Sequence, residues 1–536
     1  MRASKVFFVL FVIAALPLPT LANFSPVSAQ AGGAPYWPTN GWQTSTPEEQ
    51  GIDSAQLLKV LDIMVENETT APINSVLVIR HGYLVLDASM YPFSTSQPHA
   101  TYWVTTGFLS AVVGIAIDQG AIQGVDQSIW DYFDQTATAE LDDRKEGLVL
   151  ENLLTMTSGL KLYDVDSRMY RLAQDEQPWA QFVLDQQMQS QPGTQFGFAD
   201  SVAHLTSAIV SQATGRSAFE FAQENLFAPL GISSATWLAD PQGVSLGGGG
   251  LYVSPYDMAK LGYLYLHGGE WEGQQIVSAD WVAAATTSIA CDGCPKYGYY
   301  WWLEDPGALQ PSAYSFYAVV GYAGQQIVVF PQKDLIVVLT GSTNSSFALA
   351  DKIIPETVLP AVQSDAPLPA NPDAATALAA KVAALADPEP AAIPPAPTLA
   401  QQVSGQTYTL SKNTMNWTSV ALEFGEAEAL LKLGTSEGLL ELPVGLDGVY
   451  RVTPVRRPAV LVPLKSGFSQ IPRLTDVSLA VRGSWRNDTS FNIWMCDQVG
   501  MESWLLSITY EEDGIKFLVS EGLQGFTTAL TGTPQS

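Results

Sequence analysis

Short apolar runs near both ends of the region from about 50 to 360 predict the strands of a single sheet. Two β-branched runs, at 75–80 and 83–86, are joined by a His-Gly pair, which is typical of a tight hairpin turn. The later runs at 326–330 and 335–339 are apolar throughout, as central strands are. Because helical patterns fill the sequence between the two pairs, we expect an antiparallel sheet whose edges come from opposite ends of this region, with helices packed against it.

The pattern changes after an Ala- and Pro-rich segment at 366–402, which we interpret as a linker with a short helix from about 374 to 386. From residue 403 to 536, short alternating runs follow one another between turn residues, which predicts an all-β domain, closed or nearly closed into a barrel. Residues 30–365 form the preceding domain. The barrel strands are expected at 407–410, 420–424, 460–464, 490–494 and 504–510.

Composition describes an ordinary globular chain with an acidic surface. The chain has 536 residues, enough for two or three domains, and 47% of them are hydrophobic. The formal net charge of -28 argues against nucleic acid and anionic membranes as partners, because both require a basic face.

The first 29 residues have the pattern of a secretion signal. Arg2 and Lys5 precede an apolar core at 6–16, and a small-residue site predicts cleavage after Ala29, with Ala22 as the alternative. No later stretch offers about 20 uninterrupted apolar residues, so no membrane span is expected. We therefore expect an exported, extracytoplasmic protein.

The cysteines fit an oxidising location. Cys291 and Cys294 enclose a tight turn that can close into a small disulfide loop. A redox motif would need a thioredoxin-like pattern of strand and helix around it, and a metal site would need two further ligands nearby; the sequence shows neither. Cys496 lies in an apolar strand-like run, and we expect it to be a buried free thiol.

One predicted helix has two residues at its first turn that bear on the question of catalysis. Apolar residues recur at helical spacing between 109 and 117, and Gly120 is a plausible stop. Trp103 and Thr106 would share one face at the first turn of this helix. An indole cannot attack an acyl carbon, and a threonine cannot act as the base that a serine nucleophile needs.

Four phrases, taken in order, resemble the β-lactamase-related serine hydrolases, the group of class C β-lactamases, D,D-peptidases and related esterases. The resemblance extends over roughly residues 45 to 350 and implies an α/β (α+β) fold, with an antiparallel sheet flanked by helices plus a helical subdomain. A trailing β-domain occurs in many members. The four phrases are 153–160, 192–196, 249–259 and 324–331.

The same resemblance implies three active-site elements, and each is altered here. Ser-x-x-Lys at the start of a central helix falls on Trp103 and Thr106. Tyr-x-Asn falls on a segment that begins with Phe198 and ends with Asp200, so the ring is kept and the hydroxyl is lost. Lys-x-Gly or His-x-Gly on the sheet edge falls on Val319 and Gly321, and is followed by Gly324 and Gln325.

Other candidate groups are weaker. A displaced Ser-x-x-Lys at 158–161 lies at a helix C-terminus, where the helix dipole opposes an oxyanion. Thr105 and Thr106 have no lysine or tyrosine partner at matching spacing, and Ser110, one turn deeper, is expected to be a small helix-packing residue. A lone acid such as Asp200 is more often a cap or turn residue. The four histidines are scattered and predict neither a catalytic pair nor a metal site; they are His81, His99, His204 and His267.

Three hypotheses follow. The first is an exported pseudo-hydrolase whose cleft binds a small molecule, a peptide or a protein partner, against the alternative that its aromatic side chains pack together and close the pocket. The second is a hydrolase of esters, amides or β-lactams that uses Thr105 or Thr106. The third places ligand binding in the barrel, near Trp485, Trp494 and Trp504. No cofactor is expected, and the sequence does not indicate an oligomeric state. The expected cleft residues are Trp103, Thr106, Phe198, Asp200, Tyr322, Gly324 and Gln325.

Overall fold

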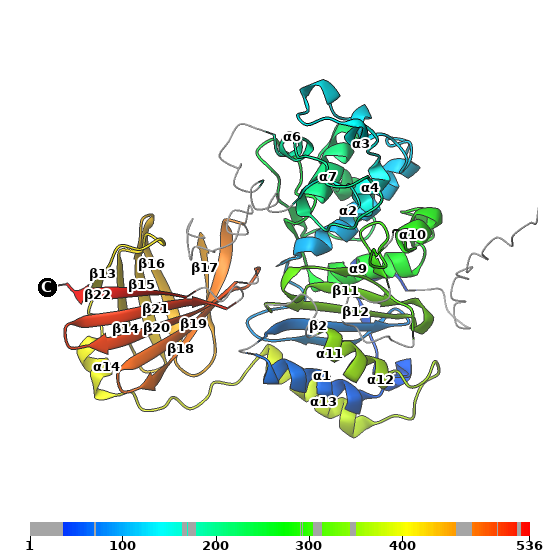
Figure 1. The fold of residues 1–536 in the computed structure, drawn as a ribbon. Helices are drawn as coiled ribbons and strands as arrows, with labels where there is room; N and C mark the ends of the chain where they lie inside the picture. Colours follow the sequence, from blue (N-terminus) through cyan, green and yellow to red (C-terminus); the bar gives the residue numbers. More distant parts are fainter. Residues whose placement is uncertain are drawn as a thin grey trace, which may run out of the picture.

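The computed structural model contains a mixed α/β domain and a C-terminal β-barrel (Figure 1). The predicted signal segment at 1–29 lies outside the described residues. The structure describes residues 36–68, 71–162, 169, 178–289, 291, 293–303, 314–343, 350–456, 474–500, 502–522 and 527–535.

The first domain is built on a sheet whose strands come from both ends of the domain, as predicted. Its early strands β2 and β3 meet the late strands through the pairing of β2 with β12. All neighbours are antiparallel except β1 and β3. In spatial order the strands are β1 (Gln43–Thr44), β3 (Tyr83–Ser89), β2 (Ile73–Arg80), β12 (Leu335–Gly341), β11 (Gln326–Phe330), β10 (Tyr317–Val320) and β9 (Trp302–Leu303).

The turn between β2 and β3 shows why its sequence favours a hairpin. His81 and Gly82 both have positive φ, 51° and 78°. Two consecutive left-handed residues twist the chain in the sense of the flanking strands, and glycine adopts that conformation without steric cost.

Alternate residues of the sheet point to two separate cores. Leu77 and Ile79 of β2 face one side of the sheet, called the helical side below because the helical subdomain lies there. Val76 and Val78 face the opposite side. On the helical side α9 (Pro255–Leu266) lies against the sheet, where Gly262 permits close contact with Ile327. Above it lie α2 (Thr105–Asp118) and α7 (Asp200–Thr214) (Figure 1).

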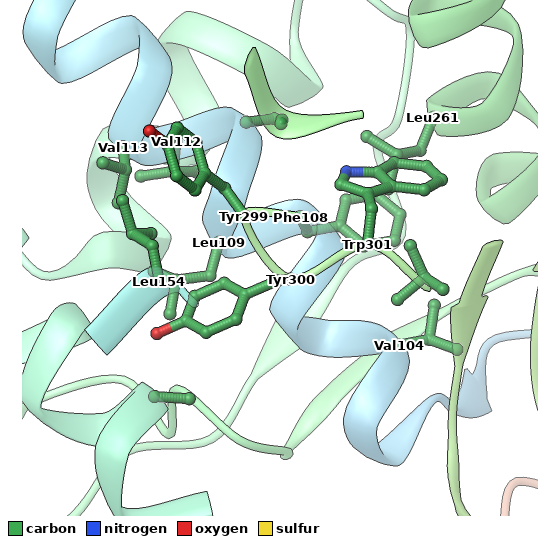
Figure 2. Close-up of a cluster of buried hydrophobic side chains, with 14 of the residues drawn as sticks. Val104, Phe108, Leu109, Val112, Val113, Leu154, Leu261, Tyr299, Tyr300 and Trp301 are labelled. Atoms are coloured by element: carbon green, nitrogen blue, oxygen red, sulfur yellow. The ribbon is translucent and has the colours of Figure 1, made fainter. Parts of the chain in front are cut away.

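Figure 2 shows side chains of the core on the helical side, including Phe108 and Leu109 of α2 and the aromatic residues Tyr300 and Trp301. The opposite face is covered by α1 (Ser54–Glu66) and α13 (Pro372–Ala386) (Figure 1). α13 is the helix expected within the Ala- and Pro-rich segment, and Leu378 is buried where it packs against α1 and β3. This part of the segment therefore adds to the core of the first domain.

The remaining helices are short, and the small strands form two further sheets. The helices are α3 (Asp143–Glu146), α4 (Leu150–Leu154), α6 (Trp179–Leu184), α8 (Ala218–Ala222), α10 (Ala279–Ala285), α11 (Ala350–Ile353), α12 (Leu359–Ala361) and α14 (Thr398–Val403). The strands are β4 (His99–Ala100), β5 (Thr236–Trp237), β6 (Leu251–Val253), β7 (Glu270–Trp271) and β8 (Gln274–Gln275).

The C-terminal domain is a closed barrel, as the sequence predicts. The described strands pair in antiparallel order, and a parallel contact between Gly445 of β16 and Arg482 of β18 closes the ring. β17 (Arg451–Arg456) pairs with β18 outside this closure, and the strand expected at 460–464 lies outside the described residues. The ring follows the order β16 (Gly438–Gly445), β15 (Glu428–Thr435), β14 (Ser419–Phe424), β13 (Tyr408–Leu410), β22 (Thr527–Pro534), β21 (Gly514–Glu521), β20 (Ser503–Glu511), β19 (Ser490–Asp497) and β18 (Asp476–Asn487).

Hydrogen bonds join the barrel to the first domain beside β4. The Ala100 backbone N–H donates to the Val499 carbonyl at 2.7 Å, and the Gln498 side chain donates to the Pro92 carbonyl at 2.6 Å. The loop after β19 thus continues the edge of the small β4 sheet. This contact lies three residues before Trp103 in the sequence.

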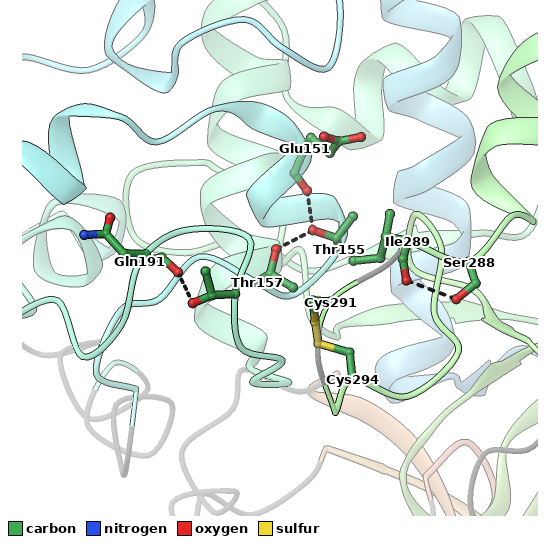
Figure 3. Close-up of a disulfide and its surroundings, with 9 residues drawn as sticks. Glu151, Thr155, Thr157, Gln191, Ser288, Ile289, Cys291 and Cys294 are labelled. Carbon is green, nitrogen blue, oxygen red and sulfur yellow. Dashed lines mark hydrogen bonds between the residues drawn. A yellow bond between two sulfur atoms is a disulfide. The ribbon is translucent and has the colours of Figure 1, made fainter. Parts of the chain in front are cut away.

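Cys291 and Cys294 form the predicted disulfide (Figure 3), and Cys496 is a buried free thiol, also as predicted. Within the described parts of the chain, every helix is too short or too polar to cross a bilayer.

Candidate functional site

Trp103 lies in a tight turn that leads directly into α2. The turn is a 3₁₀ helix (Tyr102–Val104), and α2 begins at Thr105. Tyr102 has a φ of 47°, which places a non-glycine residue in the left-handed region immediately before the indole. The sequence pattern therefore predicts the helix correctly, but Trp103 belongs to the turn before it.

The Trp103 ring contacts two other aromatic rings. Its centroid is 5.0 Å from that of Phe198 and 5.7 Å from that of Tyr322, with interplanar angles of 60° and 58°. Phe198 precedes α7, and Tyr322 belongs to a 3₁₀ turn after β10. All three side chains are half-buried. Trp103, Phe198 and Tyr322, hereafter the aromatic surface, thus meet from three separate elements.

The aromatic surface continues into residues that sequence reasoning missed. Trp302 stacks near Phe198 with a centroid distance of 6.4 Å and an angle of 20°, and Phe196 lies 5.7 Å from Trp302. Tyr102 lies 6.1 Å from Tyr322. Phe196 was visible as the last residue of a family-like phrase, whereas Trp302 carries no such motif.

The two threonine hydroxyls bond within the fold. Thr106 Oγ1 donates to the carbonyl of Trp103 at 2.8 Å, and only 2% of Thr106 is exposed. Thr105 is fully buried; its Oγ1 lies 3.2 Å from Thr101 Oγ1 and accepts from the Leu251 backbone N–H at 3.4 Å. Neither hydroxyl faces a lysine in these contacts, so their geometry gives no activated nucleophile.

Asp200 is covered by the glycine-rich segment that precedes β6. It is the first residue of α7 and is 4% exposed. A Cβ placed on Gly248 would lie 2.5 Å from the Cα of Asp200 and 2.6 Å from its Cβ. This close approach excludes any larger residue at position 248 and restricts access to Asp200.

The sheet-edge element packs against α2. Val319 is buried, and its Cγ2 lies 2.6 Å from where a Cβ on Gly107 would stand. A Cβ on Gly321 would lie 2.6 Å from the Thr101 carbonyl oxygen. The apolar side chain of Val319, which the resemblance assigns to the position of a cationic residue, therefore faces the first turn of α2.

Gln325 holds the turn that carries Tyr322. Its side chain is fully buried; Nε2 donates to the carbonyls of Gly341 and Tyr322 at 2.7 and 3.2 Å, and Oε1 accepts from the Gly341 N–H at 3.2 Å. Gly324 in the same turn has a φ of 95°, which favours glycine. Gln325 therefore positions the aromatic surface through the backbone, although we expected it to line the cleft.

Two carboxylates of the barrel influence groups of the first domain, Glu521 at Tyr322 and Glu502 at His99. Burial and the charge of Glu521 raise the pKa of the Tyr322 phenol. Burial lowers the pKa of His99 to about 4, although Gln325 and the charge of Glu502 oppose that shift. His99 is consequently neutral near pH 7. No sequence pattern could predict this contribution, because the barrel carboxylates and the residues they influence are about 200 to 400 positions apart.

The remaining candidates have structural surroundings. Ser158 is buried and accepts from the Leu160 N–H at 3.4 Å. His81 bonds to the Gln50 side chain at 3.0 Å. His204 pairs with Asp240 at 3.1 Å in the interior, a contact that no short motif could reveal across 36 residues. The described residues contain no cluster of potential metal ligands.

The barrel tryptophans pack within their own domain. Trp485 lies 5.2 Å from Phe424, and Trp504 is 5% exposed in the barrel core. Arg482 lies 5.8 Å from the Trp494 ring. These contacts do not single out a ligand site in the barrel.

Comparison with known proteins identifies relatives of the first domain. The sequence model of the Beta-lactamase family matches residues 64–356. A 6-aminohexanoate-dimer hydrolase of Paenarthrobacter ureafaciens is 21% identical over 319 residues, covering 56% of this chain and 80% of that protein. Among solved structures, an octameric penicillin-binding protein homologue from Pyrococcus abyssi is 14% identical with a TM-score of 0.45, covering 89% of this chain and 99% of its own. A penicillin binding protein from Bacillus halodurans is 19% identical with a TM-score of 0.44, covering 56% and 99%.

Proposed function

The chain belongs to the beta-lactamase family, and on this premise we propose that it is an exported, catalytically inactive member whose aromatic surface binds an apolar or aromatic ligand. The observation that carries the proposal is the contact of Trp103, at the position of the family's nucleophile, with Phe198 and Tyr322.

A tryptophan at this position removes both the chemistry and the space for it. Loss of a serine nucleophile from a hydrolase reduces turnover by a factor on the order of 10⁶. An indole also presents roughly 200 Å² of surface, and at the nucleophile position it would take the space that an acyl group needs. Acyl transfer by the family mechanism has no route through this side chain.

The supporting groups of that mechanism are also absent. Thr106 stands at the position of the lysine base and bonds to the backbone of Trp103. Phe198 keeps a ring but lacks a phenol oxygen, and Val319 is an apolar packing residue. Because nucleophile, base and hydroxyl partner are replaced together, restoring any one of them would leave the site without an activated nucleophile.

The aromatic surface supports a binding role. Its three rings are half-buried and belong to separate elements, so ring surface remains accessible while the backbone beneath is fixed. Aromatic side chains provide large apolar contact areas at low conformational cost. A ligand would lie on these rings, because Trp103 occupies the space beneath them.

Two features support export. The N-terminal pattern is that of a signal segment, and the Cys291–Cys294 disulfide is of the kind that persists in oxidising compartments.

Turnover by the purified full chain tests the inactivity. We expect hydrolysis of p-nitrophenyl butyrate and of a chromogenic cephalosporin to stay at the rate of buffer. Thr105→Val and Thr106→Val serve as matched variants. If the chain hydrolysed either substrate faster than buffer does, and either variant abolished that activity, the proposal would be refuted, because a threonine would then be a working nucleophile.

A further inference from the structure

We propose that the aromatic surface takes a small organic cation, of the size of tetramethylammonium or phenyltrimethylammonium. The inference deepens the proposed function and rests on it. It follows from three observations: the arrangement of the rings, the loss of positive charge from the site, and the carboxylates that the barrel adds.

The rings are inclined to one another instead of stacked. Trp103 makes angles of 60° with Phe198 and 58° with Tyr322. An inclined set presents ring faces in more than one direction, and the faces of tryptophan, phenylalanine and tyrosine attract cations through their quadrupoles. Quaternary ammonium groups suit such surfaces because they are apolar in shape and positive in charge.

The site has lost the cations that would repel such a ligand. Thr106 and Val319 occupy the two positions where the family resemblance implies basic residues, and both are buried and neutral. In the described part of the chain, cation–π contacts occur at other rings, namely Tyr314, Tyr450 and Trp494.

The barrel supplies negative charge at the same place. Glu521 is buried, and after burial itself its negative charge is the second cause that raises the pKa of the Tyr322 phenol. The Ala100–Val499 hydrogen bond holds the barrel loop beside the segment that leads to Trp103. His99 acts with Glu502 but stays neutral near pH 7, so it adds no positive charge. An ionised Glu521 therefore favours a cation over an anion beside Tyr322.

Binding to the full chain tests the inference with three matched ring compounds: phenyltrimethylammonium, benzyl alcohol and benzoate. Isothermal titration calorimetry, supported by saturation-transfer NMR, measures each affinity. We expect saturable binding of phenyltrimethylammonium and affinities at least about 10-fold weaker for the neutral alcohol and the anion, because a ring contact with a cation contributes roughly 2- to 30-fold depending on desolvation. Equal affinity for the cation and the alcohol would overturn the inference.

Variants locate the site. Trp103→Leu should weaken phenyltrimethylammonium binding at least about 10-fold, whereas Trp485→Leu should leave it unchanged. Trp485 is the matched control, because it is a half-buried tryptophan that contacts other rings in the barrel. Glu521→Gln should weaken binding of the cation several-fold and leave benzyl alcohol unaffected. Unchanged cation binding by Trp103→Leu would also overturn the inference.

A folding failure of Trp103→Leu does not remove the test. Trp103→Phe keeps a smaller ring and should bind with intermediate affinity, and Glu521→Gln acts through charge alone. Failure of this inference is distinguishable from failure of the proposed function: absence of cation selectivity refutes the ligand class, whereas esterase turnover refutes the inactivity.

Discussion

Thr106 Oγ1 donates a 2.8 Å hydrogen bond to the carbonyl of Trp103, so the residue that the resemblance assigns to the base position closes the turn that carries the residue assigned to the nucleophile position. The bond adds to the one that the same carbonyl accepts from the Thr105 backbone N–H, and the indole of this turn contacts Phe198 and Tyr322. Trp103 and Thr106, the two residues that we propose replace a catalytic pair, are thus joined by a local side-chain-to-backbone bond.

Removing this hydroxyl should destabilise the domain. Thr106→Val keeps the shape of the side chain and loses the bond, which should lower the free energy of unfolding by about 1 kcal/mol. Thr106→Ser keeps a donor and should lose less. Chemical denaturation measures both variants. A Thr106→Val protein as stable as the wild type would show that the bond contributes nothing.

Gly107 should be intolerant of a side chain because of Val319. In Gly107→Ala the new Cβ would lie 2.6 Å from Val319 Cγ2, and overpacking of this kind costs about 1–3 kcal/mol. Val319→Ala in the same chain removes the clash, so the double variant should be more stable than the sum of the two single effects predicts. A double-mutant cycle of unfolding free energies measures this coupling, and strict additivity would contradict the packing.

His99 should make stability depend on pH in the acidic range. Its pKa in the folded chain is about 4 against an ordinary value of 6.5, chiefly because of burial. Below about pH 6.5 the unfolded chain binds a proton that the folded chain does not, so stability falls as pH decreases towards 4. The slope for one such proton is at most about 1.4 kcal/mol per pH unit.

The control for this dependence is His99→Asn. The difference in unfolding free energy between wild type and variant should be constant above pH 7 and should shift in favour of the variant between pH 6.5 and 4. A parallel pH dependence of the two proteins would exclude His99 as its source.

The number of cysteines that react with an alkylating agent should depend on whether the protein has been reduced. Denatured but unreduced protein should take up one alkyl group, at Cys496, and the reduced protein should take up three. Mass spectrometry counts the adducts. Because the disulfide closes a very short loop, with a sequence separation of 3, Cys291→Ser with Cys294→Ser should cost no more than about 2 kcal/mol of stability. Three adducts without reduction would contradict the bonded state.

Restoring the family motif tests how much of the catalytic scaffold survives. A chain with Trp103→Ser, Thr106→Lys and Phe198→Tyr should gain ester hydrolysis above the wild type, since Trp103 would no longer fill the acyl position. Turnover of p-nitrophenyl butyrate measures the gain, and the variant with Trp103→Ser alone is the control. A folded triple variant without turnover would show that oxyanion stabilisation is also lost.

Sequence patterns were sufficient to predict the elements that form through contacts between neighbouring residues. The His81–Gly82 turn, the helical period of α2 and the short spacing of Cys291 and Cys294 depend on neighbouring residues, and each element forms as the sequence predicts. The assignment of Trp103, Thr106, Phe198 and Val319 to the active-site positions rests on the collinear phrases of the resemblance and stays a prediction.

Contacts between distant segments were not predictable from these patterns. Trp302 stacks near Phe198 from a strand about 100 residues later, and Asp240 meets His204 inside the helical region. The bond from Ala100 to Val499 crosses between domains. Such pairings depend on how whole elements pack, and no spacing rule within one segment encodes them.

Covalent labelling tests the central claim, that the fold is kept and its acyl-transfer chemistry lost, most directly. Purified full-length protein is incubated with a fluorophosphonate serine-hydrolase probe and examined by intact-mass and peptide mass spectrometry, with an active serine hydrolase as positive control. The account predicts an unmodified chain. A stoichiometric adduct on any residue from 103 to 110 would contradict it.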